Sequence, residues 1–146
     1  MSLTASARRI GDTLRHEIDV NKRHTIVTDE PAELGGTDTG PAPHELLPAT
    51  LASCIATMIS MYAQRKGWQL SGVSVDVEYD HESVPRHFEV VVHLPDGLAP
   101  EQVERLRRVA ETCPVRRAME AGFSFDEEIR PVPAGSRRAS AVSRSN

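Results

Sequence analysis

The stretch that decides the fold is Leu46-Leu-Pro-Ala-Thr-Leu-Ala-Ser-Cys54, which continues without a charged residue to Gln64. Pro48 lacks an N–H and fits best in a first helical turn, so the helix is expected to start near Leu46. Gly67 is expected to end it. Its apolar residues recur at helical spacing and define one face, made of Leu47, Leu51, Cys54, Ile55, Met58 and Tyr62.

The same stretch is close to the length of a membrane-spanning helix. It is interrupted, however, by five residues that break its apolar continuity, namely Pro48, Thr50, Ser53, Thr57 and Ser60. We therefore expect a buried core helix and no membrane span. The segment from Met1 to Ile10 carries arginines with no apolar core after them, so no signal peptide is expected. This favours a cytoplasmic protein with reduced thiols.

Length and charge limit the remaining possibilities. At 146 residues the chain is most simply one domain, which we place at residues 1–130, with a core of real size. Residues 131–146 are mostly Pro, Ser, Arg and Ala and are predicted to be a disordered tail. The net charge of -4 argues against nonspecific nucleic-acid binding. The six histidines and two cysteines form no pair at a usual metal-ligand spacing, so no metal or cofactor is predicted.

Alternating apolar residues predict two antiparallel hairpins. The first pairs residues 14–20 with 23–28 around Asn21-Lys22, and the second pairs residues 73–79 with 88–94. A loop rich in glycine and proline, residues 30–43, separates the first hairpin from the apolar helix.

Two shorter helices and a strand are expected after the second hairpin. Pro100 opens one helix, and Cys113 caps another that starts at Pro114 and ends at Gly122. Phe123, Phe125 and Ile129 indicate a last strand. The predicted order is β-β-α-β-β-α-α-β, in which each half pairs an antiparallel hairpin with a helix, and the predicted class is α+β.

Two uncommitted cysteines indicate redox chemistry, because cytosolic proteins seldom keep structural disulfides. The apolar surroundings of Cys54 raise its thiol pKa, so a reactive Cys54 needs a nearby cation. Candidates are Arg23, His24, His44 or an arginine of the second half. Cys113 stands where the first amides of a helix would favour a thiolate. The alternative is that both cysteines are small core hydrophobes.

Four segments together resemble a known family. They are Asp29-Glu30-Pro31, the run from Gly35 to Leu47, Ala49-Thr-Leu-Ala-Ser-Cys54 and Cys113-Pro114-Val115. They are similar to the OsmC/Ohr family of osmotically inducible and organic-hydroperoxide-resistance proteins, over roughly residues 10 to 130. The specific part of the signature is the pairing of a cysteine late in the apolar helix with a second cysteine before Pro-Val.

The resemblance implies an intertwined homodimer with two long cysteine-bearing helices at its centre, sheets built by both chains, and active sites at the interface. It implies reduction of organic hydroperoxides, with Cys54 attacking the peroxide and becoming a sulfenic acid. Cys113 then condenses with it to a disulfide, and a dithiol reductant, a lipoylated protein in some members, restores both thiols.

In that family an arginine near the first hairpin turn and a glutamate before the helix hold the attacking thiolate. The arginine falls most naturally on Arg23, with Arg15 as the alternative. His44 stands ten residues before Cys54, where the family's glutamate is usual, and Glu45 is one residue late. This departure indicates the broader OsmC-like branch. His44 either replaces the carboxylate or merely caps the helix, and Glu45 is either a base or, as we favour, a carboxylate that interacts with the helix dipole.

Three functions are therefore compared. The first is a thiol-dependent peroxidase that uses Cys54 and Cys113. The second is a protein that binds a small hydrophobic ligand in an apolar pocket, with incidental thiols. The third is an acyl-transfer enzyme built on Cys54 and His44.

Overall fold

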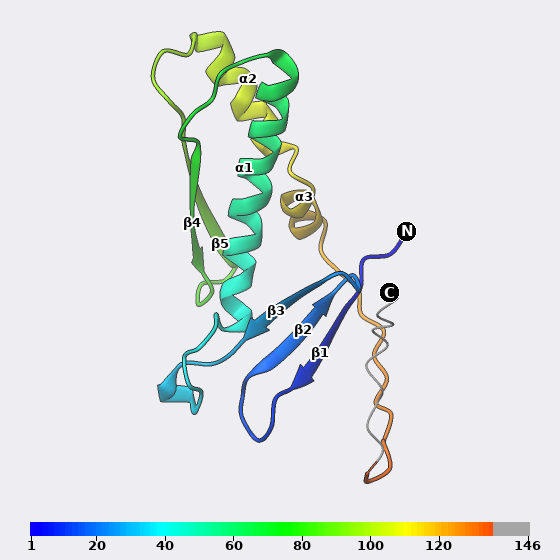
Figure 1. Cartoon of the computed structure of the whole chain (residues 1–146). Coiled ribbons are helices and arrows are strands. Elements are labelled where there is room, and N and C mark those ends of the chain that lie inside the picture. The colour runs from blue at the N-terminus through cyan, green and yellow to red at the C-terminus, as the bar shows by residue number, and fades with distance from the viewer. Residues whose placement is uncertain (136–146) are drawn as a thin grey trace. The chain divides into compact units, whose positions relative to one another are not determined.

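The computed structural model describes residues 1–135 of the chain (Figure 1). It contains two compact units: among the described residues, unit 1 combines Met1–Pro41 with residues 124–135, and unit 2 is Ala42–Phe123. The single domain at residues 1–130 therefore stays a prediction. Most of the tail predicted at residues 131–146 lies outside the described residues.

Unit 1 contains a three-stranded antiparallel sheet in the order β1-β2-β3, made of β1 Ala5–Arg9, β2 His16–Val20 and β3 His24–Thr28. The predicted first hairpin is confirmed: Val20 pairs with His24, and Asn21 and Lys22 between them both have positive φ angles. Strand β1 was not predicted, because all five of its residues are exposed and show no apolar alternation. Its ladder with β2 defines it.

The loop after β3 is organised around the Asp29 carboxylate, which is 1% exposed. Three backbone N–H groups and two hydroxyls donate to it, from Glu30, Thr37 and Thr39. Together, with the Thr37 hydroxyl first among them, they hold the Asp29 pKa well below its usual value. A Cβ at Gly36 would lie 1.8 Å from the Glu30 carbonyl oxygen, so the loop closes only with glycine there.

Unit 2 is built around α1, Leu46–Lys66, which follows a short 3-10 turn at Pro43–Glu45. This helix packs on strand β4 of an antiparallel hairpin and on two shorter helices (Figure 1). Those elements are β4 Ser74–Asp80, β5 His87–His93, α2 Pro100–Glu111 and α3 Pro114–Ala121. The second predicted hairpin, the three helices and the end of α1 at Gly67 are all confirmed.

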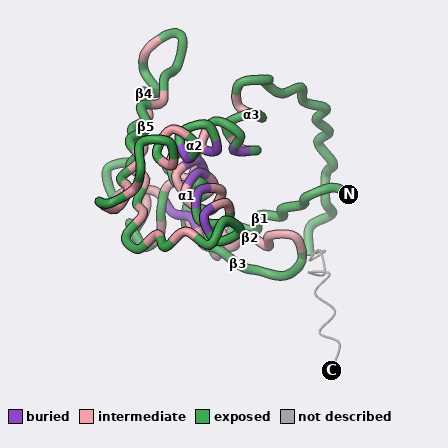
Figure 2. Tube along the Cα trace, turned by 90° about the horizontal axis from the view of Figure 1, so that it is seen from above, coloured by how far each residue is buried: buried purple, intermediate pink, exposed green. Residues whose placement is uncertain are grey.

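The buried residues of unit 2 lie mainly on α1 and on the helices beside it (Figure 2). The inaccessible cluster consists of Leu51, Ile55, Ile59, Leu106 and Cys113. The buried residues of α1 are spaced four apart, at Leu51, Ile55, Ile59 and Ala63. Leu47, one turn earlier, is 39% exposed. The predicted apolar face was therefore correct in its middle and wrong at its first residue.

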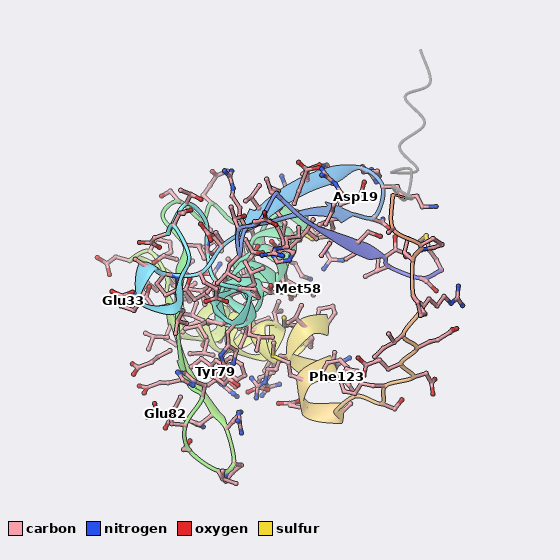
Figure 3. The ribbon with its side chains drawn as sticks, turned by 90° about the horizontal axis from the view of Figure 1, so that it is seen from below. Asp19, Glu33, Met58, Tyr79, Glu82 and Phe123 are labelled. Carbon is pink, nitrogen blue, oxygen red and sulfur yellow. The ribbon has the colours of Figure 1, made fainter. Side chains whose placement is uncertain are left out.

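The predicted last strand is absent: residues 122–133 have no regular secondary structure. Phe123 lies just beyond α3 (Figure 3), and it is 67% exposed, while Phe125 and Ile129 are 85% and 90% exposed. Alternating apolar residues become a strand only when another strand supplies the hydrogen bonds, and within one chain none does so here. The observed order is β-β-β-α-β-β-α-α, and the class remains α+β.

The segment Pro43–Lys66 is long and apolar enough, by length and composition, to cross a membrane. The core helix of a soluble protein satisfies the same criterion, so this is weak evidence for a span. Only 22% of its most apolar window is buried within the chain.

Candidate active site

The two cysteines of the chain meet inside unit 2. Cys54 is half-buried in the middle of α1, and Cys113 is 0% exposed at the residue that precedes α3. The two thiols lie close enough for Cys113 to raise the pKa of Cys54, although nearly sixty residues separate them in the sequence. The contact forms because α3 packs on α1. Both thiols are free, so the arrangement is that of a reduced pair.

Burial governs the electrostatics of Cys54. It raises the pKa of this thiol above its usual value, and the hydrogen bond with Cys113 raises it further. The backbone N–H of Val115 acts in the opposite direction. The apolar sequence around Cys54 predicted a raised pKa. In unit 2 taken alone, this sulfur is a neutral thiol.

The first turn of α3 lies next to the two cysteines. Cys113 occupies the N-cap position, but its side chain makes no capping hydrogen bond to the helix. Pro114 has no N–H. The stabilisation of a Cys113 thiolate by the amides of this turn stays a prediction.

His44 lies among aromatic rings at the start of α1. Its ring meets Tyr79 edge-on at a centroid distance of 5.3 Å and His81 at 5.1 Å, and Tyr79 stacks on Phe88 at 4.4 Å. Sequence reasoning missed this cluster, although strand alternation places residues 79 and 81 on one face of the hairpin. From the start of α1 to Cys54 the helix rises by about 12 Å. Among residues 1–135, no hydrogen bond joins His44 to Cys54.

Glu45 has a local structural contact. Its Oε2 accepts the Ala42 N–H at 2.9 Å, which completes the turn that leads into α1. This agrees with the interpretation that we favoured, a carboxylate at the beginning of a helix.

Residues 36–128 match the family of OsmC-like proteins. The chain belongs to this family. The OsmC-like chain is similar in structure to an osmotic stress induced and detoxification response protein from Psychrobacter arcticus 273-4, with 26% sequence identity and a TM-score of 0.66 over 80% of this chain and 87% of that chain. No curated protein sequence matches it with significance.

Two further solved structures resemble this OsmC-like protein. An organic hydroperoxide resistance protein OsmC from Legionella pneumophila has 25% identity and a TM-score of 0.56, covering 82% of this chain and 89% of that chain. An OsmC-like protein from Mycoplasma pneumoniae has 14% identity and a TM-score of 0.61, covering 82% and 88%, which supports the fold.

Two arginines of unit 1 bear on the family pattern. Arg23 is exposed and follows the turn between β2 and β3. A second hairpin connection joins β1 to β2, and Arg15 stands at the end of that connection. Arg15 Nε is buried, and among the described residues it has no hydrogen-bond partner.

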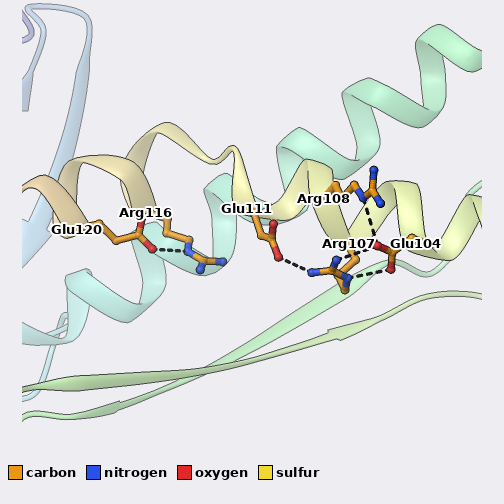
Figure 4. A network of polar contacts seen from close by, with 6 residues as sticks. All are labelled: Glu104, Arg107, Arg108, Glu111, Arg116 and Glu120. Atoms are coloured by element: carbon orange, nitrogen blue, oxygen red, sulfur yellow. Dashed lines mark hydrogen bonds and ion pairs between the residues drawn. The ribbon is translucent and has the colours of Figure 1, made fainter.

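The charged groups on α2 form a separate surface of the OsmC-like protein. Glu104 pairs with Arg107 and Arg108, and these contacts lower its pKa to about 2 (Figure 4). A cavity of about 370 Å³ lies on this helix and includes neither thiol; it is lined by Pro100, Glu101, Glu104, Arg105 and Arg108. Within residues 1–135, no group of three or more His, Cys, Asp or Glu side chains is placed to hold a metal ion.

Proposed function

We propose that this protein is a thiol-dependent peroxidase that reduces organic hydroperoxides. The observation that carries the proposal is that the two free thiols, Cys54 and Cys113, lie together in the packing of unit 2. Membership of the OsmC-like family supports it, as does the likeness to the organic hydroperoxide resistance protein of Legionella pneumophila.

The reaction begins when the Cys54 thiolate attacks the terminal oxygen of the hydroperoxide. A sulfur–oxygen bond forms, the O–O bond breaks, and the alkoxide leaves as an alcohol after taking a proton, so Cys54 becomes a sulfenic acid. The Cys113 sulfur then attacks Cys54, an S–S bond forms, and the hydroxyl leaves as water. A dithiol reductant exchanges with this disulfide and becomes oxidised in turn.

Activation of Cys54 requires a cation, because its pKa is raised in unit 2. We assign this role to Arg15 in preference to Arg23. Arg15 stands at the end of the β1–β2 connection, and its buried Nε has no protein acceptor among the described residues.

A homodimer with active sites at its interface is part of the proposal. It rests on the family resemblance and on α1, whose uncharged stretch is only 22% buried within one chain. His44 is kept in the proposal only for its position in the sequence, where the family's glutamate is usual, whereas Glu45 is omitted because its carboxylate accepts the Ala42 N–H. A cytoplasmic location with a dithiol reductant completes the proposal.

The two alternative functions have less support. An acyl-transfer enzyme needs Cys54 next to His44, and the His44 ring instead contacts Tyr79 and His81. Among the described residues, binding of a hydrophobic ligand around the central helices has no cavity to carry it, because the cavity described lies on α2 and includes neither thiol.

The decisive experiment measures consumption of cumene hydroperoxide with an excess of dithiol. Cys54→Ser should lower the rate at least about 100-fold, since the nucleophile is lost. Cys113→Ser should still form one sulfenic acid per chain, trapped by dimedone, and the wild-type protein should form a Cys54–Cys113 disulfide. Wild-type consumption no faster than that of Cys54→Ser would disprove the proposal.

The choice of arginine is tested in the same assay. Arg15→Ala should lower the rate about tenfold or more, because an adjacent cation favours the thiolate. Arg23→Ala is the matched control and should change the rate less. The opposite order would transfer the role to Arg23.

A further inference from the structure

Two histidine rings that are distant in the sequence meet at the start of α1. The ring centroids of His44 and His81 are 5.1 Å apart, and the two planes are inclined at 62°. Both residues are exposed, so dissolved ions can reach them. A search for ligands at short spacing misses this pair, because only folding brings the two segments together.

The backbone that carries each of the two rings is held by hydrogen bonds. His44 belongs to the 3-10 turn Pro43–Glu45, which is closed by the bond of 2.9 Å that the Ala42 N–H donates to a carboxylate of the turn. His81 directly follows β4, and the Asp80 carboxylate before it accepts two backbone N–H groups of the next turn at 3.1 Å each. The two imidazoles therefore start from ordered positions, which lowers the entropic cost of bringing both onto one ligand.

The neighbours of the pair position the rings and favour a cation. The Tyr79 ring meets His44 edge-on at 5.3 Å and lies 6.0 Å from the His81 ring, and Phe88 stacks on Tyr79 at 4.4 Å. Each imidazole can still turn about its last torsion at little cost. Backbone N–H groups lower the pKa of Asp80, so a negative charge stands next to His81 in the chain and attracts a cation.

The geometry points to a binding site for a divalent transition-metal ion, such as Zn²⁺ or Co²⁺, held by one ring nitrogen each of His44 and His81. Neutral imidazole is a preferred ligand of these ions. Metal–nitrogen bonds of about 2.0–2.1 Å at a tetrahedral angle place two imidazole centres about 5 Å apart, which matches the observed separation. Within residues 1–135 no group of three or more His, Cys, Asp or Glu side chains is placed to hold a metal, so water completes the coordination. The site goes beyond the proposed function, whose reaction takes place at the thiols.

The test follows the binding of Co²⁺ to the full-length protein by NMR, because this ion is paramagnetic and broadens the signals of nearby nuclei. The Tyr79 signals should broaden, and His81→Ala should raise the Co²⁺ concentration for half of this effect at least about tenfold, since one of two protein ligands is lost. The matched control is His87→Ala, which should bind as the wild type does. His87 is exposed and, by strand alternation, lies on the face of the hairpin opposite to Phe88. Equal binding by the wild type and His81→Ala, or an equal loss in both variants, would overturn the inference.

A second set of variants separates one shared ion from two independent ones. If both imidazoles hold the same ion, His44→Ala and the double variant with His81→Ala should each bind Co²⁺ as weakly as His81→Ala alone. Losses that add from the single variants to the double one would show separate sites and overturn the inference. A thiolate-to-cobalt absorption band without broadening at Tyr79 would assign the ion to the cysteines, with the same consequence. No hydroperoxide is present, so the result is independent of peroxidase activity.

Discussion

Each of the two units contains an acidic group, and the surroundings shift the pKa values of the two groups in opposite directions. In unit 1, Asp29 accepts hydrogen bonds from three N–H groups and two hydroxyls, and its pKa lies well below the usual value. In unit 2, Cys54 packs among apolar side chains next to Cys113, and burial raises its pKa.

The difference separates a structural group from a reactive one. A carboxylate with a complete set of donors is ionised in the folded protein and gains nothing from further contacts, so Asp29 orders its loop. A thiol with an incomplete set of donors stays neutral and unreactive until another group stabilises its thiolate, so its reactivity depends on that group. The comparison predicts that unit 1 depends on polar contacts and unit 2 on apolar packing.

The largest expected effect comes from the apolar side of this comparison. Ile59→Ala removes a side chain that is 1% exposed and should lower the free energy of unfolding by about 3 kcal/mol, through lost burial and a cavity. Denaturant unfolding measures it. Met61→Ala, on the exposed side of the same helix, should cost less than about 1 kcal/mol. Equal losses would show that this face of α1 is not the core of unit 2.

An intermediate effect is expected from the polar side. Asp29→Asn removes the charged acceptor and should lower the melting temperature at neutral pH by roughly 5 °C or more. Because the folded pKa of Asp29 lies below its unfolded value of 3.8, its contribution is present above that pH and lost as the pH falls toward the folded value. As the pH is lowered, the melting temperature of Asp29→Asn should therefore fall less steeply than that of the wild type. Parallel curves would contradict the role of the carboxylate.

The smallest effect is expected on the surface of α2. Glu104→Gln removes an exposed ion pair with Arg107 and Arg108 and should change the melting temperature by no more than about 2 °C, less in high salt. The Glu104 pKa is lowered from 4.5 to about 2, so any contribution is lost between these pH values as the solution is acidified. A larger change than in Asp29→Asn would reverse the ranking of the polar contacts.

The elements that sequence alone predicted are those whose signals are local. The uncharged run of α1, bounded by Pro48 and Gly67, indicates a helix without any tertiary information, and alternation indicates β4 and β5. Strand β1 has no such signal, because all of its residues are exposed. It forms only through its pairing with β2. The strand expected at Phe123 and Phe125 is absent for the complementary reason. Its residues alternate, but no neighbouring strand in the described chain pairs with them, so the segment has no regular secondary structure.

The candidate site was predictable to the same extent. Helical periodicity placed Cys54 toward the core, and Pro114 placed Cys113 at a helix start, but only the packing of α3 on α1 brings the sulfurs together. The choice between Arg23 and Arg15 depends on which hairpin turn is meant, and strand β1, which has no local signal, adds the β1–β2 turn at which Arg15 stands.

The position of the two cysteines has a consequence for the stability of unit 2 against unfolding. The segment from Cys54 to Cys113 contains the whole of β4, β5 and α2, so a disulfide between them would enclose most of the unit in one covalent ring. Closing a loop of roughly 60 residues removes chain entropy from the unfolded state worth about 4 kcal/mol. Each catalytic cycle would therefore alternate unit 2 between a cross-linked form that resists unfolding and an open form that unfolds more readily.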